Sequence, residues 1–339
     1  MIYELEDTSK VEKLFAGMED SMIRSCLEKV MGKVYVTDLE NPKSAMAFLA
    51  EFAFLAGEPD AELAAFKPEG AVNLSSPDGK WEALIHECWP GAYKETRYAI
   101  KKDTKFDREK LKAIVASLPA GYEIKRIDEE LYDMCLDDED FEENVVYFES
   151  KEDFLEHGRG FVVLKDGKPV SAASSYTAYN EGLEVQILTK DEEQRKGLAS
   201  AACAALILSC LDDGLYPSWD AANLESVHLA EKLGYEFSHE YNSYYLSEVF
   251  DHVIKNPDRS KWDSFCGRYQ RLDDAARIYE IDRNGDELYY HFVNPEEGMR
   301  FDLRLYPIGE DTFGLNEDDF TLVFADCGMT IDGKACKKL

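Results

Sequence analysis

The alternation of apolar and polar positions predicts a chain of mixed helices and strands, with its clearest elements in the middle. Residues 198–211 (LASAACAALILSCL) carry no charge, so the helix that they predict must be buried on nearly every side. The uncharged run is too short to span a bilayer as a helix. Before it, the apolar segments 160–164 and 170–179 are joined across the Asp166-Gly167 pair, which predicts a β-hairpin. Residues 184–189 are predicted to follow as the next strand.

The chain beyond the buried helix continues with a strand and a second helix. The strand is predicted over residues 216–222. Asn223 is a natural N-cap for the helix that follows, and Gly234 is a natural stop. The middle of the chain therefore predicts one α+β domain.

The first part of the chain mixes helical and strand patterns. Residues 11–31 have apolar side chains at helical spacing, residues 32–36 predict a short strand, and residues 45–55 are strongly apolar. Two strands are predicted over residues 81–88 and 93–101, and a charged helix over residues 107–118. The following residues 119–121 (PAG) mark a boundary, so residues 1–119 are predicted to form an N-terminal α/β companion domain.

Two further domains are predicted after this boundary, over residues 120–248 and 249–339. In the last one, residues 301–306 alternate with period two and residues 321–324 predict another strand, which indicates a small β-rich accessory domain. Residues 282–286 (DRNGD) are similar to a calcium loop, but the glycine is misplaced and Val293 stands where the final Glu would be. We interpret them as a hairpin turn and expect no metal site.

Composition limits the classes of partner. The formal net charge of −31 argues against nucleic-acid binding, because the phosphate backbone would be repelled. A cationic amine substrate is compatible with this charge, although such acidity is more often a solubility trait. The eight cysteines form no C-x-x-C pair, and the N-terminus has no export signal, so we expect reduced thiols and a cytoplasmic protein without membrane contact. Cys203 and Cys210 are expected to be core residues.

The segment 184–199 carries the most informative chemistry. It predicts a strand, a charged loop and a helix start, which brings free backbone N–H groups to the positive end of a helix dipole. Arg195 and Lys196 lie beside them. Such a loop is suited to bind a phosphate or pyrophosphate.

Residues 194–199 (QRKGLA) resemble the pyrophosphate loop of the GNAT superfamily of acetyl-CoA-dependent acetyltransferases, which reads Gln/Arg-x-x-Gly-x-Gly/Ala. The spacing of Asn223, Ser226, Leu229 and Gly234-Tyr235 is similar to the second motif of that family. The resemblance covers roughly residues 120–247 and implies a GNAT fold, with a mixed, largely antiparallel sheet flanked by helices. The chain looks like a bacterial group with an extra N-terminal half. Whether that half is a degenerate GNAT-like fold stays open.

The resemblance implies a site for acetyl-CoA as co-substrate. Backbone groups of Ile187, Leu188 and Thr189 would bind the pantetheine arm and the acetyl carbonyl. The pyrophosphate would be held by Gln194, Arg195, Lys196, Gly197, Leu198 and Ala199. Asn223 and Ser226 would contact the cofactor as well. The reaction implied is direct attack of a small-molecule amine on the thioester within a ternary complex.

Glu184 is the candidate general base. Strand alternation places Glu184 and Gln186 on one face, with Val185 and Ile187 on the other. The alternative is that Glu184 is a partly exposed strand residue. Acting as a base near neutral pH would require burial to raise the pKa of Glu184.

The general acid of the family is missing here. Many members carry a Tyr seven residues after the Asn, where this chain has Ala230. Ser226, Tyr235 or water are the candidate substitutes. His228 is the other candidate, but a helical His is more often a surface or packing residue.

The acceptor is less defined than the cofactor. Residues 128–143 are strongly acidic and fall where family members place the helices that border the acceptor pocket, although acidic runs are usually solvated. The rival to an enzyme is a non-catalytic module that binds acyl-CoA or a partner, for which Ala230 is the main argument. The sequence leaves the acceptor and the oligomeric state open.

Overall fold

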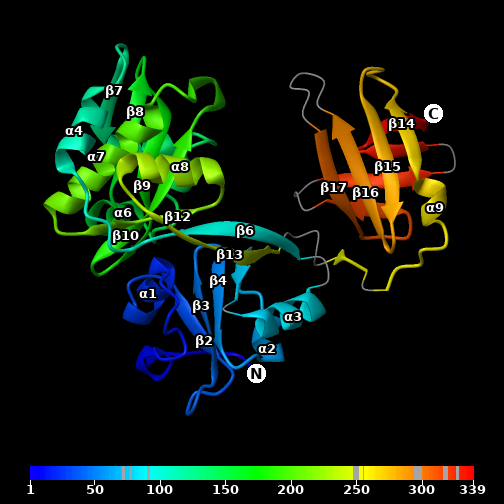
Figure 1. Cartoon of the computed structure of the whole chain (residues 1–339), viewed down its shortest axis with the longest axis horizontal. Helices are drawn as coiled ribbons and strands as arrows, with labels where there is room; N and C mark the ends of the chain where they lie inside the picture. The colour runs from blue at the N-terminus through cyan, green and yellow to red at the C-terminus, as the bar shows by residue number, and fades with distance from the viewer. Residues whose placement is uncertain are drawn as a thin grey trace. The chain divides into compact units, whose positions relative to one another are not determined.

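The computed structural model describes residues 1–70, 73–76, 78–89, 92–246, 252–254, 256–293, 300–315, 320–325 and 328–339. These residues form two compact units (Figure 1). The first consists of residues 1–81 and 95–243, and the second of residues 82–94 and 244–339.

A five-stranded sheet forms the centre of the predicted α+β domain. Its strands are β7 (Tyr122–Arg126), β8 (Gly160–Lys165), β9 (Lys168–Tyr179), β10 (Gly182–Thr189) and β11 (Tyr216–Ser218). The order is β11-β10-β9-β8-β7, and every pair is antiparallel except β10 and β11. The predicted hairpin and the strand after it are confirmed.

Helix α7 (Leu198–Asp212) covers one face of this sheet and packs beside α4 (Arg108–Ala116). Its side chains belong to a core cluster that includes Cys203 and Cys210, as the uncharged run predicts. The remaining helices of the domain are α5 (Glu129–Leu136), η2 (Glu142–Asn144), η3 (Asp191–Glu193), α6 (Lys151–His157) and α8 (Leu224–Leu233). The predicted N-cap is confirmed, since Asn223 Oδ1 accepts a 2.9 Å hydrogen bond from the Ser226 N–H.

The N-terminal half contains a second succession of strands with the same pairing. Strands β1 (Tyr3–Glu4), β2 (Lys33–Val36), β3 (Ser44–Leu49) and β4 (Phe52–Gly57) are antiparallel neighbours, and β5 (Asn73–Ser75) is parallel to β4. Where the second half has the long helix α7, this half has only the short α2 (Ala61–Ala64). The Asp60 side chain caps α2 by accepting from the N–H groups of Glu62 and Leu63. The pairing agrees with the hypothesis that this half is a degenerate GNAT-like fold, which stays a sequence prediction.

The helix predicted over residues 11–31 forms in part. The structure has η1 (Thr8–Lys10), then turns, then α1 (Ser21–Glu28), which packs against both β3 and β9. Helix α1 is therefore in contact with the sheets of both halves, as Figure 1 shows.

The second half also adds two strands to the sheet of the N-terminal half. β12 (Asp220–Ala221) pairs with β6 (Tyr93–Ile100), and β13 (Phe237–Tyr245) lies between β5 and β6. The prediction of a single strand over residues 216–222 is wrong. β11 ends before the buried Trp219, and β12 begins after it in the other sheet. Residues on both sides of position 119 lie in the same compact unit. The domain boundaries at 119 and 248 stay sequence predictions.

The strand predicted over residues 81–88 is also wrong, since this segment is helix α3 (Gly79–Cys88). Asp78 Oδ1 accepts hydrogen bonds from the N–H groups of Lys80 and Trp81, which caps a helix start. Trp81 and Ile85 are fully buried and four positions apart, which is the spacing of one helix face.

The C-terminal segment folds as a closed barrel. Its strands are β14 (Gly267–Arg271), β15 (Ile278–Asn284), β16 (Glu287–Val293), β17 (Arg300–Pro307), β18 (Thr312–Gly314), β19 (Thr321–Ala325), β20 (Gly328–Ile331) and β21 (Lys334–Lys338), with α9 (Trp262–Phe265) before them. The interior is aromatic, with the rings of Phe265 and Phe324 stacked at 4.2 Å. The predicted hairpin turn at residues 282–286 joins β15 and β16.

Three predicted absences concern the described residues only. Within those ranges no cluster of His, Cys, Asp or Glu side chains that could hold a metal ion is found. The cysteines that the structure describes are free thiols. None of the helices among the same residues is long and apolar enough to cross a membrane.

Candidate active site

The edge of β10 opens partway along the strand. β10 pairs with β11 only at Gly182, Leu183 and Glu184. β11 ends at Ser218, and β12 pairs with β6 instead, so in the described part of the chain residues 185–189 have no strand neighbour on this edge. These residues are half-buried. Their unpaired backbone groups can bind an extended amide-containing chain as a further strand would, and the predicted Ile187, Leu188 and Thr189 all lie here.

The loop after β10 presents a run of free backbone donors. In the described contacts, the N–H groups of residues 195–200 donate no hydrogen bond. Arg195 (φ 59°) and Gly197 (φ 83°) are both left-handed, which turns successive N–H groups toward one side. The first turn of α7 has no acidic residue and no side-chain cap. The helix dipole and the free donors make this a site for an anion.

The side chains of this loop differ in whether they already form hydrogen bonds within the protein. Arg195 is exposed, whereas the Lys196 ammonium bonds to the Glu192 carbonyl at 2.7 Å and to the Glu193 carboxylate at 2.8 Å. Gln194 donates to Asp191 Oδ1 at 2.8 Å. Of the two basic residues predicted to bind the pyrophosphate, Arg195 is thus the one whose side chain forms no hydrogen bond or ion pair with the described residues.

Glu193 anchors the loop to the sheet. Its carboxylate accepts hydrogen bonds from Lys165 at 2.6 Å, from Lys196, and from the Tyr122 hydroxyl. Bonds from Lys165, Lys196 and Tyr122, in that order, lower the pKa of Glu193 to about 2. The sequence contains no signal for this role, because Tyr122 and Lys165 come from β7 and β8.

Glu184 lies at the point where β10 leaves β11. Its side chain is 4% exposed, so the alternative of a partly exposed strand residue is wrong. Oε2 accepts a hydrogen bond from Ser21 Oγ at the start of α1 and lies 3.9 Å from Lys102 Nζ. Oε1 is buried and accepts no hydrogen bond from the described residues. Burial raises the pKa of the Glu184 carboxyl, while Lys102 and the Ser21 hydrogen bond act in the opposite direction.

The face alternation predicted for β10 is confirmed. Val185 and Ile187 pack against the core cluster that contains α7. Gln186 faces the other way and its Nε2 lies 3.4 Å from a carboxylate oxygen of Glu143. A bulge between Glu184 and Val185 shifts the register against β9 at this point.

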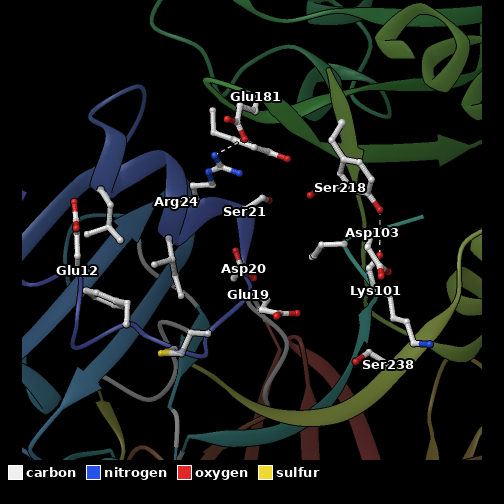
Figure 2. Close-up of a pocket in the computed structure, with 17 residues that line it drawn as sticks. Glu12, Glu19, Asp20, Ser21, Arg24, Lys101, Asp103, Glu181, Ser218 and Ser238 are labelled. Atoms are coloured by element: carbon white, nitrogen blue, oxygen red, sulfur yellow. Dashed lines mark hydrogen bonds and ion pairs between the residues drawn. The ribbon is translucent and has the colours of Figure 1, made fainter. Parts of the chain in front are cut away.

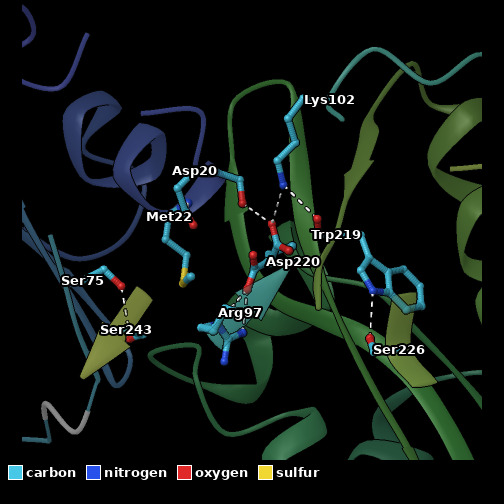
Figure 3. A network of polar contacts seen from close by, with 11 residues as sticks. Asp20, Met22, Ser75, Arg97, Lys102, Trp219, Asp220, Ser226 and Ser243 are labelled. Atoms are coloured by element: carbon cyan, nitrogen blue, oxygen red, sulfur yellow. Dashed lines mark hydrogen bonds and ion pairs between the residues drawn. The ribbon is translucent and has the colours of Figure 1, made fainter. Parts of the chain in front are cut away.

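Glu184 contacts a cluster of charged residues that no sequence pattern predicted. Figure 3 shows Asp20, Lys102 and Asp220 of this cluster. Lys102 Nζ donates to the Trp219 carbonyl at 3.0 Å, and Arg97 is paired with Asp220 at 2.6 Å. Burial acts against the ammonium of Lys102, but Glu184 and Asp20 outweigh it and raise its pKa.

Asp20 is the second carboxyl of this cluster and is half-buried. It caps α1 by accepting from the Met22 N–H at 2.8 Å. Burial and then the charge of Glu184 raise the pKa of Asp20 to about 7. Asp20 and Ser21 come from the N-terminal half, so no pattern around Glu184 could reveal them.

The candidate acids occupy different surroundings. Ser226 is half-buried and its Oγ accepts from Trp219 Nε1 at 3.1 Å, which leaves its own proton free to donate. Tyr235 is buried and its hydroxyl donates to the Pro217 carbonyl at 2.7 Å. Burial raises the pKa of Tyr235 well above its usual value. Ala230 is a fully buried core residue, and His228 is exposed.

The acidic stretch is partly neutralised by lysines, of which Lys151 lies 2.9 Å from Asp133. Lys190 Nζ lies 3.0 Å from both Asp138 and Asp140. These carboxylates therefore already have a cation, and a role for the stretch in substrate binding stays a prediction.

A mostly antiparallel sheet, one parallel pair that separates partway along, and a free-amide loop leading into a buried helix define the GNAT class of fold. The chain belongs to the GNAT acetyltransferase family, whose sequence pattern matches residues 12–244. The resemblance seen in the sequence is confirmed, and the match includes most of the N-terminal half.

Two relatives show the extent of the similarity. A GCN5-related N-acetyltransferase-like protein from Streptococcus suis 89/1591 is 41% identical, with a TM-score of 0.69 over 71% of this chain and 99% of that chain. The "Uncharacterized N-acetyltransferase YdfB" of Bacillus subtilis (strain 168) is 35% identical over 132 residues, which is 38% of this chain. The match spans about half (49%) of the length of that curated relative.

Proposed function

We propose that the protein is an acetyl-CoA-dependent N-acetyltransferase that acetylates a small-molecule amine by direct attack in a ternary complex. The observation that carries this proposal is the order of features along β10. The anion-binding loop follows the strand, the open edge occupies residues 185–189, and the buried carboxyl of Glu184 stands where that edge begins. About 17 Å of extended strand separate Glu184 from Thr189.

The residues present fit acetyl-CoA. The N–H groups of residues 195–200 and the Arg195 side chain would hold the pyrophosphate, and the edge of residues 185–189 would bond the amides of the pantetheine arm. Acetyl-CoA supplies an acetyl group already activated as a thioester. Asn223 and Ser226, at the start of α8, are the remaining proposed contacts to the cofactor.

Glu184 is proposed as the base. An incoming ammonium loses one proton to the Glu184 carboxylate, and the neutral amine attacks the thioester carbonyl. The C–N bond forms, the C–S bond breaks, and the second amine proton goes to the departing thiolate to give the free thiol. Ser226 is the proposed relay for that second proton, since its hydroxyl donates to no acceptor among the described residues.

The test is acetyl transfer to a panel of amines, followed by thiol release. Wild type is expected to release thiol only when an amine is present. Glu184→Gln keeps the shape of the side chain and is expected to lower kcat/KM by about 10²–10⁴-fold and to remove the acidic limb of its pH profile. Glu280→Gln, an exposed change on β15, is the matched control and should leave the profile unchanged. An unaltered profile in Glu184→Gln would show that another group is the base.

The rival function is a non-catalytic module that binds acyl-CoA. The observation in its favour is Ala230, a buried core residue at the position where many family members have an acid. Tight binding of CoA without any amine-dependent thiol release would establish this rival.

A further inference from the structure

The cluster around Glu184 contains more carboxyls than cations. Among the described residues its carboxyls are Asp20, Glu184 and Asp220, and its cations are Arg97 and Lys102. Arg97 is paired with Asp220 at 2.6 Å, which leaves Lys102 for Asp20 and Glu184. Two carboxyls beside one cation do not both ionise easily when they are withdrawn from water, so one of them keeps its proton to a higher pH than the other.

The contacts of Lys102 favour the ionised form of Glu184. Lys102 Nζ lies 3.9 Å from Glu184 Oε2, whereas within the described residues it forms no ion pair with Asp20. A 3.0 Å hydrogen bond to the Trp219 carbonyl, between β11 and β12, holds the ammonium in this place. The Ser21 hydroxyl donates to Glu184 Oε2 as well. A cation and a hydroxyl donor therefore act on the same carboxylate oxygen and stabilise its negative charge.

The pKa shifts of the two carboxyls agree with this distribution of charge. Burial raises the pKa of Glu184, and Lys102 and then the Ser21 hydrogen bond oppose the rise. Burial and then the negative charge of Glu184 raise the pKa of Asp20 to about 7. Asp20 therefore keeps its proton after Glu184 has ionised.

The other titratable groups that face these side chains add no further cation within the described residues. They are Tyr179 of β9, Tyr216 of β11, Asp220 of β12, Tyr235 after α8 and Tyr241 of β13. Burial raises the pKa of Tyr179, Tyr235 and Tyr241, so their hydroxyls are neutral where a carboxyl titrates. Among the described residues, Lys102 is thus the cation with which Glu184 forms an ion pair.

A cavity of about 850 Å³ borders this cluster within the first unit. Asp20, Ser21 and Lys102 line it, and Glu184 does not. Figure 2 shows Asp20 and Ser21 next to each other at the start of α1. The cavity gives Asp20 access to solvent, whereas Glu184 is separated from the cavity by the two residues that stabilise its charge.

We propose that Lys102 and Ser21 are positioning residues that keep the negative charge on Glu184 and leave the proton on Asp20. The inference rests on the proposed function for the role of Glu184 as the base. It adds that the N-terminal half, through α1 and the segment after β6, sets the charge of that base. Glu184 must be ionised before it can take a proton from the incoming ammonium.

The experiment measures the charge of Glu184 in two ways. The first is the pH dependence of kcat/KM for the best amine of the panel. The second is a pH titration of the Glu184 carboxyl by infrared difference spectroscopy, with Glu184→Gln as the reference and without any substrate.

Lys102→Met should move the acidic limb of the kcat/KM profile and the carboxyl titration to higher pH by about 1–3 units, because the pKa of Glu184 rises when its cation is removed. The lost activity should return at high pH, which a merely structural role of Lys102 would not produce. Lys102→Arg keeps the charge and should stay near wild type. Lys110→Met, at an exposed position on α4 outside the cluster, is the matched control.

Ser21→Ala should shift both measurements in the same direction by about one unit, and Ser21→Thr, which keeps the hydroxyl, should restore them. This pair also carries the test if circular dichroism shows that Lys102→Met does not fold. Asp20→Asn replaces a protonated carboxyl by a neutral amide, so it should move the acidic limb by less than about half a unit. Asn is as good an N-cap as Asp, so α1 should persist.

A Glu184 titration that is the same in wild type, Lys102→Met and Ser21→Ala would overturn the inference. So would a large downward shift in Asp20→Asn, since Asp20 would then be the carboxyl that ionises first. A shifted carboxyl titration in Lys102→Met, with no amine-dependent thiol release by wild type at any pH, would support the assignment of charge and contradict the proposed function.

Discussion

The buried carboxyl of Glu184 and the half-buried carboxyl of Asp20 share one cluster, and their proton occupancy links stability to pH. Burial raises the pKa of both side chains, and the charge of Glu184 raises that of Asp20 further. A proton is therefore held in the folded state over a pH range in which the unfolded chain has lost it.

The first prediction concerns Asp20→Asn and stability. The stabilisation due to protonated Asp20 is fully present below the usual carboxyl pKa of about 4, and it is lost as the pH rises through about 7. Asn does not titrate, so the variant should lose about 1–3 kcal/mol of the wild-type difference in unfolding free energy between pH 4 and pH 7.5. Urea unfolding at several pH values measures it. Identical pH slopes in wild type and variant would contradict the assignment, and Asp137→Asn should match wild type.

At the scale of elements, the start of α7 depends on one backbone conformation. Gly197 has φ 83°, and a Cβ added there would meet no atom within 4 Å. A substitution at this position therefore acts through backbone strain and not through a clash.

The second prediction is that Gly197→Ala weakens CoA binding about 5–10-fold, because a side chain in the left-handed region costs about 1–2 kcal/mol. Titration calorimetry with CoA measures the effect. Gly121→Ala is the matched control, since Gly121 has φ 90° and equally open surroundings but lies before β7. The same loss of affinity in both variants would show that the effect is global.

The third prediction concerns the anchor of the loop. Glu193→Gln removes the charge that holds Lys165 and Lys196. The amide hydrogens of residues 193 and 194, which are bonded to the carbonyls of residues 190 and 191, should therefore exchange faster, and CoA should bind about threefold more weakly. Hydrogen exchange and calorimetry are the measurements. Glu192→Gln is the control, because only the backbone carbonyl of Glu192 makes a contact. Unchanged exchange in Glu193→Gln would mean that the loop does not rely on this carboxylate.

At the scale of the molecule, the two halves of the first unit depend on each other, because strands of the second half lie in the sheet of the N-terminal half. β12 has its partner β6 in the N-terminal half, and β13 lies between β5 and β6. The sheet of residues 122–218 would lose the packing of α1 and the partners of β12 and β13 if it were isolated.

The fourth prediction follows from the position of β12 and β13 in the sheet of the N-terminal half. A fragment of residues 120–246 should give a poorly dispersed NMR spectrum and bind no CoA, whereas residues 1–246 should give a dispersed one. The reason is that exposed strand edges and apolar surface are left without partners. A shorter fragment that is well dispersed and binds CoA as the full chain does would show that the second half folds independently.

The fifth prediction concerns the net charge of −31. Its field attracts a cationic acceptor, and the Debye length falls from about 10 Å to about 3 Å between 0.1 M and 1 M salt. KM for a diamine should therefore rise about 3–10-fold over that range, as measured by steady-state kinetics. An arylamine that is uncharged at neutral pH is the control acceptor. Equal salt dependence for both acceptors would show that the field does not steer the substrate.

The sequence predicted the fold best where local pattern and tertiary environment agree. The uncharged run at residues 198–211 could only be a buried helix, and Asn223 could only cap the helix after it. It was misleading at residues 81–88, where apolar residues suited a strand, and at residues 216–222, where one apolar run serves two sheets. Short apolar runs do not distinguish these outcomes, because periodicity needs length.

The sequence by itself determined the family, because the family pattern depends on residues close together in the chain. It also singled out the loop after β10 and Glu184 for the proposed site, since local composition specifies the backbone geometry there. Only the tertiary structure decided what surrounds Glu184. Ser21, Asp20 and Lys102 reach it from the other half of the unit through α1 and the segment after β6. Burial and charge at a site depend on neighbours that are distant in sequence, so no local sequence pattern predicts them.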